Sequence, residues 1–582
     1  MVRLLNVTLM YRKFEGVVMN DFKRTQEQID IIQAVVDGKS IKISAQAGSS
    51  KTTTLVMAAE AVVKPMLYLT FNKAMQEEAR NKFPSWVEVR TTHSMAYSAV
   101  GYQYQSKLKR PMGHYVNVAG TASEVAKFFK ISPLEYQEGK WLTSASIGYA
   151  VLATVRAFEC SDSDVLSNEH ISMFAVKAKR LDKKSHKKTI DTYKKDVLRH
   201  SKALWELRVN LKSKVLAEHD TYLKLWQLSK PNLNEYDVLM VDEFQDTNMC
   251  VVDIVRNQNT QVVLVGDPSQ SIYQFRGALN ALDKFDYEAF SLSQSFRYGQ
   301  DVADIGGAIT GRSGMKGWEQ LDTKVHSSED TTSTFPESYT AIYRTNSGMM
   351  IDAVEAIANG KSVNIVTDIR DFTNLIDSVL AIKAGDMKKV KHQSLLVYES
   401  WKELLTDLDW ASSEVQRVCA MIKDNSVYKV LGLLKAHRNT PSPDITFVTA
   451  HKSKGLEYDN VVLGSDFPSI YDNKGARRDL PIAETNLLYV AATRAKYNLK
   501  TNDQVEERIG NGVATKGFEI NVKKIEVHEK FMESPVDAFT RSLDQQIGGM
   551  YASVGMDGVD QLMSTEYDDC DLDGNEIDFI RQ

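Results

Sequence analysis

The stretch IKISAQAGSSKT, residues 41–52, joins a short apolar run to the start of a helical pattern, and it decides the fold class of the chain. A buried strand that turns into a helix through small residues and a Lys-Thr pair is typical of a phosphate-binding loop. Backbone N–H groups at the start of the helix would meet the phosphates, Lys51 would contact the β- and γ-phosphates, and Thr52 would hold Mg²⁺. We therefore predict a nucleotide-binding set of Ala47, Gly48, Ser49, Ser50, Lys51, Thr52 and Thr53.

Two positions of this loop differ from the usual pattern. Ala45 stands where the first glycine is expected, and Ser50 precedes Lys51 where glycine is usual. Taken alone, the loop is therefore also compatible with a polar turn between a strand and a helix. Serine is small enough to keep the backbone close to a phosphate, so we expect Ser50 to reduce flexibility at most.

A second apolar run, VLMVDEFQD at residues 238–246, ends in acidic residues. A carboxylate at a strand end can hold Mg²⁺ directly or through water, and Asp242 suits that role. The adjacent Glu243 can act as a base or position the attacking water. An Asp-Glu pair alone is compatible with a solvated strand end, but its combination with a phosphate loop favours a site for ATP and Mg²⁺.

Two regions of the chain alternate short apolar runs with helical patterns, which predicts two α/β units. In the first region, the strands are expected at residues 41–45, 66–71, 238–242 and 262–267. The second region is expected to begin near Phe290, with strands at residues 341–344, 445–449 and 460–463. Each region is interrupted by a long insertion of helical spacing, which parallel α/β cores tolerate in the loops at strand ends.

Charge and cysteine content exclude several classes of protein. The formal net charge is −5, so a surface for nucleic acid would have to be a local basic patch. The four cysteines form no CxxC pair, which argues against a zinc ribbon, an iron–sulfur cluster and a disulfide framework. Neither a signal peptide nor a run of about 18 apolar residues is present, so we expect a soluble, intracellular protein that does not contact membrane.

The string DEFQD resembles motif II of superfamily 1 helicases of the UvrD/Rep/PcrA type, and similar motifs occur in the expected order. They are TQEQ at residues 25–28, LTFNKA at 69–74, TTHS at 91–94, VGDPSQSIYQFRGA at 265–278, QSFR at 294–297, TAHKSKGLEY at 449–458 and LYVAATRA at 488–495. The resemblance covers about residues 20–500. Residues 67–77 and 219–228 look most like the F-box DNA helicase branch, but no F-box is evident, so a ubiquitin-ligase role is not implied.

The resemblance implies two RecA-like domains, 1A and 2A, with ATP in the cleft between them and a mostly helical insertion in each, 1B and 2B. We expect domain 1A at residues 1–96 plus 221–284 and subdomain 1B at 97–220. Domain 2A is expected at 285–350 plus 441–550, and a short subdomain 2B at 351–440. Residues 551–582 are strongly acidic, and we expect a disordered tail that docks on a protein partner or shields the DNA groove.

The resemblance also implies roles for single residues in ATP binding. Gln28 would read adenine, Phe296 would stack on it, and Glu457 would contact the sugar. Gln270 would sense the γ-phosphate, and two arginine fingers would stabilise its developing charge. The implied catalytic set is Lys51, Asp242, Glu243, Gln270, Arg297 and Arg494.

Single-stranded DNA would cross the tops of both domains. The implied contacts are Phe71, Asn72, Thr92, His93, Tyr273, Phe275 and His451. Aromatic stacking on bases tolerates any sequence, which suits a motor. Phe275 stands where the family usually has tryptophan, so its stacking is expected to be weaker, and outside these motifs a tyrosine or histidine of this kind would be equally compatible with a structural role.

The leading interpretation is an ATP-dependent 3′-to-5′ translocase and helicase that acts as a monomer on single strands and duplex junctions. The short 2B leaves open a translocase that displaces proteins from DNA with little unwinding. Ser50 leaves open a nucleotide-gated DNA-binding protein with weak hydrolysis. The Lys- and Arg-rich residues 177–199 predict either a solvated helix face or a surface that contacts phosphates.

Overall fold

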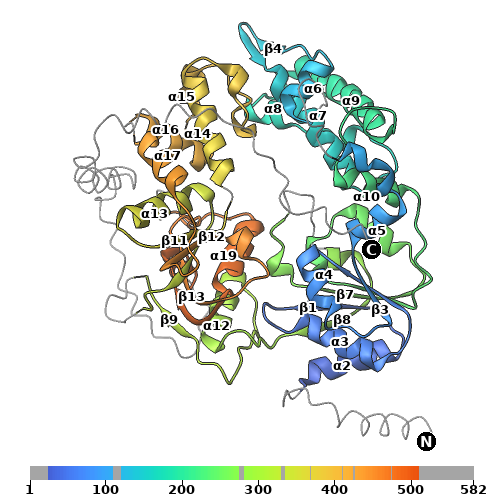
Figure 1. The fold of residues 1–582 in the computed structure, drawn as a ribbon. Coiled ribbons are helices and arrows are strands. Elements are labelled where there is room, and N and C mark those ends of the chain that lie inside the picture. The colour runs from blue at the N-terminus through green and yellow to red at the C-terminus, as the bar shows by residue number, and fades with distance from the viewer. Residues whose placement is uncertain are drawn as a thin grey trace, which may run out of the picture.

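The computed structural model describes residues 24–108, 120–273, 281–328, 335–367, 369–408, 411–423, 426–472 and 475–509. Two six-stranded sheets stand side by side, and groups of helices extend above each of them (Figure 1). All strand pairings within these two sheets are parallel. This arrangement confirms the predicted α/β class with two RecA-like domains.

The first sheet has the strand order β3-β2-β6-β7-β1-β8. Its strands are β1 (Ile41–Ala45), β2 (Met66–Thr70), β3 (Val87–Thr91), β6 (Val238–Val241), β7 (Gln261–Gly266) and β8 (Glu288–Leu292). Because the carboxyl ends of parallel strands meet at one edge, the loops after β1, β6 and β7 emerge together. The phosphate loop, the DEFQD acids and motif III therefore start from neighbouring strands.

Helices cover both faces of the first sheet, which explains why the strands β2, β6 and β7 read as nearly continuous apolar runs. One core holds the sheet against α2 (Gln26–Val36), α3 (Lys51–Ala61) and α4 (Lys73–Arg80). A second core on the other face holds α5 (Thr92–Ala99), α10 (His219–Leu228) and α11 (Met249–Arg256). Leu67 and Leu69 of β2 belong to the second core while Met66 and Tyr68 belong to the first, as the alternation of side chains along a strand requires.

The second sheet has the strand order β11-β12-β10-β13-β14-β9. Its strands are β9 (Lys324–His326), β10 (Tyr339–Tyr343), β11 (Val363–Ile365), β12 (Ile445–Thr449), β13 (Tyr458–Leu463) and β14 (Ala495–Lys500). Buried side chains on one face of this sheet, among them Ile342, Val448 and Val461, join one core with α12 (Gln300–Thr310), α19 (Ile482–Ala492) and α20 (Asp503–Ile509). The short α18 (Ala450–Ser453) follows β12 directly, at the edge that faces the first sheet's loops.

Two further groups of helices lie above the sheets (Figure 1). The first group has a core of its own and comprises α6 (Ala122–Phe128), the hairpin β4 (Leu134–Gln137) and β5 (Lys140–Leu142), α7 (Ser144–Glu159), α8 (Phe174–Ala178) and α9 (Lys187–Val209). The second group comprises α13 (Asn346–Ala358), α14 (Ile369–Lys383), α15 (Trp401–Thr406), α16 (Ser413–Lys423) and α17 (Val427–Ala436). Short 3₁₀ turns are η1 (Gly101–Lys107), η2 (Asn168–His170), η3 (Phe244–Asp246), η4 (Pro268–Gln270), η6 (Ala281–Lys284), η7 (Met387–Lys389) and η8 (Gln393–Leu395).

The two helical groups touch each other. Lys179, whose side chain is only 4% exposed, forms an ion pair with Glu403 at the start of α15. Thr143, the N-cap of α7, donates from its hydroxyl to the carbonyl oxygen of Leu396 at 2.6 Å. The chain therefore connects its two halves at a second place, away from the sheets.

Three expected boundaries differ from the structure. The second α/β region was expected to begin near Phe290 and domain 2A at residue 285. In the structure, β8 pairs with β1 in the first sheet. The expectation was wrong because the sequence of a single strand does not reveal its partner strand. The expected subdomain 2B at residues 351–440 includes β11, which pairs with β12, and part of α13. Helices α14–α17 share one core with the second sheet. The expected tail at residues 551–582, like residues 510–550, lies outside the described residues.

Within the described ranges, no helix combines the length and apolar character needed to cross a membrane.

Candidate nucleotide site and nucleic-acid interface

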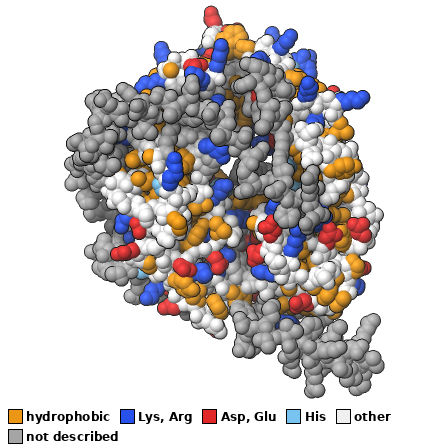
Figure 2. Space-filling model, in the orientation of Figure 1, with side chains coloured by type: hydrophobic (Ala, Val, Ile, Leu, Met, Phe, Trp, Pro, Cys, Tyr) orange, Lys and Arg blue, Asp and Glu red, His pale blue; other side chains and the backbone are white. Residues whose placement is uncertain are grey.

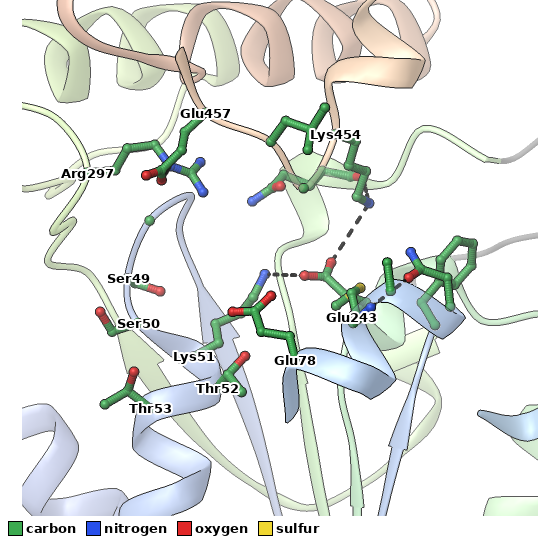
Figure 3. A pocket seen from close by; sticks show the side chains of 18 of the residues that line it. Ser49, Ser50, Lys51, Thr52, Thr53, Glu78, Glu243, Arg297, Lys454 and Glu457 are labelled. Atoms are coloured by element: carbon green, nitrogen blue, oxygen red, sulfur yellow. Dashed lines mark hydrogen bonds and ion pairs between the residues drawn. The ribbon is translucent and has the colours of Figure 1, made fainter. Parts of the chain in front are cut away.

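A cavity of about 520 Å³ lies where the loops of the first sheet meet those of the second. Figure 3 shows the phosphate loop and Glu243 on one side of it and Arg297, Lys454 and Glu457 on the other. The cavity is lined by Gly48–Thr53, Glu243, Asp246 and Gln270 from the first half of the chain, and by Phe296, Arg297, Lys454, Gly455, Leu456, Glu457 and Arg494 from the second. Most of the predicted nucleotide residues are therefore brought together, from positions far apart in sequence.

The phosphate loop has a backbone that disfavours side chains at two positions. Gly48 lies at φ +74°, and a Cβ there would approach Ser295 Oγ to 2.6 Å and Arg297 Cβ to 2.7 Å. Ser50 has φ 58° and ψ 39°, the left-handed region that glycine adopts most easily. The hydroxyl of Ser49 is buried and makes no hydrogen bond within the described part of the chain. The close approach of the backbone at Gly48 and the buried hydroxyl of Ser49, which is available as a donor, fit a phosphate group.

Lys51 and Glu243 are paired directly across the floor of the cavity. Lys51 Nζ lies 2.9 Å from Glu243 Oε1, and both side chains are 13% exposed (Figure 3). Burial raises the pKa of Glu243, but the charges of Lys51 and Lys454 outweigh it and lower the pKa to about 2. Burial lowers the pKa of Lys51, and the facing carboxylates Glu243 and Asp242 more than restore it. Both groups are thus charged, and an incoming phosphate has to replace Glu243 as the partner of Lys51.

Asp242 and Thr52 supply oxygen atoms beside this pair. Thr52 Oγ1 donates to Asp242 Oδ2 at 3.3 Å, and the hydroxyl of Tyr68 donates to the same oxygen at 2.6 Å. Hard oxygen donors of this kind suit Mg²⁺, which keeps several waters and takes few protein ligands. Asp242 is only 3% exposed and lines a neighbouring cavity, so Thr52 is the part of this pair that reaches the nucleotide cavity.

Arg297, Glu457 and Arg494 approach the cavity from the second half of the chain. Arg297 Nε lies 3.1 Å from Glu457 Oε2, and its Nη1 donates to the carbonyl oxygen of Thr493 at 3.3 Å. Arg494 is 1% exposed and donates to the carbonyl oxygens of Val490 and Leu456. Burial and the nearby charge of Arg297 lower the pKa of Arg494 to about 9, so its charge is poorly compensated as it stands. A phosphate anion in the cavity would compensate the charge of Arg494.

The structure does not bring Gln28 to the cavity. Its side chain is 2% exposed, its Nε2 donates to Thr54 Oγ1 at 3.1 Å, and its Oε1 accepts from the backbone N–H of Thr25. The bond from Thr25 completes a capping box at the start of α2. Phe296 does line the cavity, and its backbone N–H donates to the carbonyl oxygen of Gly48 at 2.8 Å. Ala47 is fully buried and does not line the cavity.

A second cavity of about 320 Å³ lies beside the first and contains most of the predicted DNA contacts. Its lining includes Phe71, Asn72, Thr92, His93 and Tyr273. The rings of Phe71 and Tyr273 are stacked, with centroids 5.5 Å apart and planes 14° apart, and Phe71 is 38% exposed. The two cavities share Phe71, Asn72 and Tyr273, so the candidate nucleotide and DNA sites are adjacent.

The remaining predicted DNA residues differ in the contacts that they make within the protein. His451 joins the aromatic pair: its ring lies 6.2 Å from that of Tyr273, whose hydroxyl donates to the His451 carbonyl oxygen at 3.3 Å. His93 Nε2 lies 2.9 Å from Asp220 Oδ1, and the side-chain oxygen of Asn72 caps α4. Phe275 lies outside the described residues.

Comparison with protein families matches residues 25–287 to the UvrD/REP helicase N-terminal domain and residues 165–501 to the UvrD-like helicase C-terminal domain. The chain belongs to the UvrD/Rep helicase family. Among curated relatives, it is 31% identical over 526 residues to F-box DNA helicase 1 of Gallus gallus and 30% identical over 524 residues to F-box DNA helicase protein 1 of Schizosaccharomyces pombe. These alignments cover 84% and 83% of this chain but 50% and 57% of the relatives, so the chain spans about half of their length.

Lys454 is a residue of this UvrD/Rep-type site that sequence reasoning missed, although it lies inside a quoted motif. It reaches from the end of α18 into the cavity and forms an ion pair with Asp246, whose carboxylate is 0% exposed. Its Nζ also donates to the carbonyl oxygen of Gln270 at 2.7 Å, and it lies 3.8 Å from Glu243 Oε2 and 5.4 Å from the centre of the Tyr273 ring. Burial raises the pKa of Asp246, to about 6, against the opposing effect of Lys454. The signal in the sequence was the position of Lys454 inside the motif that also holds His451 and Glu457; its contacts with Glu243 and Tyr273 follow only from the fold.

Proposed function

We propose that this chain is an ATP-dependent motor that moves 3′ to 5′ along single-stranded DNA and unwinds duplexes, consistent with its family. The observation that carries the proposal is the cavity in which the phosphate loop of one half of the chain faces Arg297, Lys454 and Arg494 of the other. Cations supplied from opposite sides stabilise charge on a transferring phosphoryl group only when the two halves are together. Hydrolysis is thereby linked to the relative position of the domains.

The phosphates of ATP would bind the backbone of the loop and take Lys51 from Glu243. Thr52 and Asp242 would hold Mg²⁺, which supplies neutralising charge to the phosphate oxygens when bound. Release from Lys51 removes the strongest of the effects that lower the pKa of Glu243, so the carboxylate becomes a better acceptor for a proton from the attacking water. Arg297 and Arg494 then provide cations on the opposite side of the γ-phosphate, each matching an arginine finger.

DNA would stack on the aromatic pair beside the nucleotide. Phe71 comes from the loop after β2 and Tyr273 from motif III, so the pair rests on two different elements of the first domain. Base stacking on such rings contributes about 1–3 kcal/mol per base and does not depend on sequence. Lys454 contacts both Glu243 and the Tyr273 ring, which gives a short physical route from the nucleotide to the strand. Phe275 stays a predicted stacking position.

Helix α9 is a candidate surface for the duplex ahead of the motor. Lys183 and Lys184 before it and Lys187, Lys188, Lys194, Lys195, Arg199 and Lys202 within it are exposed. Lys and Arg side chains gather along the upper right margin of the molecule, over this helix (Figure 2). If the surface binds phosphates, neutralising Lys183, Lys184, Lys187 and Lys188 together will flatten the salt dependence of duplex binding; an unchanged slope would leave α9 as a solvated helix face.

A strand-displacement assay on duplexes with 3′ or 5′ single-stranded tails, in DNA and in RNA, tests the proposal. We expect ATP-dependent displacement on 3′-tailed DNA, together with ATP hydrolysis that single-stranded DNA stimulates. Strong hydrolysis without displacement would favour the second candidate, a translocase that strips proteins from DNA. Weak hydrolysis with ATP-dependent DNA binding would favour a nucleotide-gated binding protein, the function that the left-handed backbone at Ser50 suggests.

A further inference from the structure

Tyr489 of α19 makes a contact between the two domains that the roles above do not use. Its side chain is fully buried, yet its hydroxyl makes two hydrogen bonds to the first domain. The hydroxyl accepts from the backbone N–H of Ala47, in the phosphate loop, at 3.1 Å. It donates to Asp267 Oδ2, in motif III, also at 3.1 Å. One hydroxyl of the second domain therefore joins two separate loops of the first.

Asp267 links the Tyr489 hydroxyl to Gln270, because the same carboxylate oxygen accepts a hydrogen bond from each. The Asp267 carboxylate is 0% exposed, and its Oδ2 also accepts from Gln270 Nε2 at 2.8 Å, while its Oδ1 pairs with Arg312 Nη1 at 3.0 Å. A carboxylate has only acceptors, so the amide nitrogen of Gln270 must face it. The amide oxygen of Gln270 is then the atom turned toward the cavity and Arg494, whose Nη2 lies 3.5 Å away. Asp267 thus fixes which end of Gln270 the nucleotide meets.

The rest of α19 supports the same contact. Asn486, one turn before Tyr489, donates to the carbonyl oxygens of Pro268 at 3.2 Å and Ser271 at 2.9 Å. The Tyr489 ring packs in the core of the second domain, where a Cβ on Gly306 would approach its Cε2 to 3.1 Å. Packing therefore sets the position of the ring, and the hydroxyl is the only polar part that reaches the first domain.

We propose that the Tyr489 hydroxyl is a positioning group, which holds the phosphate loop at Ala47 and, through Asp267, sets the orientation of the Gln270 amide. A nucleotide that shifts the loop changes the Ala47 bond, and the shared hydroxyl carries that change to motif III and on to Tyr273. Hydrogen bonds in such a buried chain strengthen one another, so loss of the central hydroxyl weakens both ends. This inference rests on the proposed hydrolysis of ATP and on the γ-phosphate-sensing role that the family resemblance implies for Gln270.

The test is Tyr489→Phe, which removes the hydroxyl and keeps the ring. In the full chain with single-stranded DNA, we expect kcat for ATP hydrolysis to fall about five- to tenfold, because both hydrogen bonds of the hydroxyl are lost and the net effect of such bonds is modest, with KM for ATP changed by less than about twofold. Tyr298→Phe is the matched control, because Tyr298 is buried in the same core and its hydroxyl makes no hydrogen bond within the described residues. Its kcat should equal that of the wild type, and both variants are assayed below their thermal transitions.

A double variant separates positioning from structure. If Tyr489 acts through Gln270, Tyr489→Phe will cause little further loss of kcat in a Gln270→Ala background; a full additional loss there would overturn the proposed route through Asp267 and Gln270. Wild-type kcat in Tyr489→Phe, or an equal loss in Tyr298→Phe, would overturn it as well. If Gln270→Ala alone has wild-type kcat, the proposed role of Gln270 fails, and this result differs from a failure of Tyr489 alone.

Discussion

Replacement of Lys454 by methionine will impair both catalysis and stability, and the two effects can be separated. The side chain is 9% exposed and pairs with the fully buried Asp246. Removing one partner of a buried ion pair leaves an uncompensated charge, which costs about 3–5 kcal/mol. We therefore expect the thermal midpoint of Lys454→Met to fall by several degrees.

The catalytic loss should be larger than this destabilisation explains. Lys454 lies 3.8 Å from Glu243 in the cavity, and a cation aimed at the transferring phosphoryl group is worth about 10²–10³ in kcat. The deciding variant is Asp246→Asn combined with Lys454→Met, because it removes both charges and leaves none unpaired. This variant should regain the wild-type midpoint by differential scanning fluorimetry.

The same double variant should remain about 10²-fold or more slower in DNA-stimulated ATP hydrolysis, since the cation is still absent. Asp246→Asn alone serves as the control for the loss of the acid. If the double variant hydrolysed ATP as fast as Asp246→Asn, Lys454 would merely neutralise Asp246, and its assignment to the nucleotide site would be wrong.

Two further substitutions test the nucleotide site, and a charge swap tests the contact between the two helical groups. Ser50→Gly should relieve the left-handed backbone, raise stability by about 1 kcal/mol in thermal unfolding and leave or increase kcat; lower stability would show that Ser50 is unstrained. Asp242→Asn should raise the Mg²⁺ concentration needed for half-maximal hydrolysis, and an unchanged Mg²⁺ titration would remove Asp242 as a ligand. Lys179→Glu should lower the thermal midpoint, and adding Glu403→Lys should restore it. Equal midpoints in the wild type, the single variant and the double variant would show that the contact between the helical groups contributes nothing to stability.

The sequence was sufficient to predict the parts of this protein that depend on local chemistry. A strand, a turn of small residues and a helix start at Lys51 follow from the pattern at residues 41–52, and β1 is found at Ile41–Ala45 as expected. The acids after β6 fall beside the phosphate loop because β6, β7 and β1 are neighbours in one parallel sheet. Motifs from both halves then meet in one cavity, as the resemblance implied.

Other features depend on packing that no short pattern records. β8 has the mixed sequence EAFSL, which does not reveal its partner strand, and only the fold assigns it to the edge of the first sheet beside β1. Gln28 fits its motif, yet its amide is engaged by Thr54 and Thr25. Tyr489 lies within a quoted motif, but the sequence does not reveal that its hydroxyl bonds to Ala47 and Asp267, because these contacts form only when α19 packs against the first domain.

The most direct test of the central claim is the rate of ATP hydrolysis stimulated by single-stranded DNA in Lys51→Ala, measured beside strand displacement on 3′-tailed duplexes. Lys51 lies 2.9 Å from Glu243 in the cavity, and no other described lysine comes from the phosphate loop. We expect the variant to fold and bind DNA but to lose both hydrolysis and displacement. Wild-type turnover in Lys51→Ala would show that the motor is not driven from this cavity.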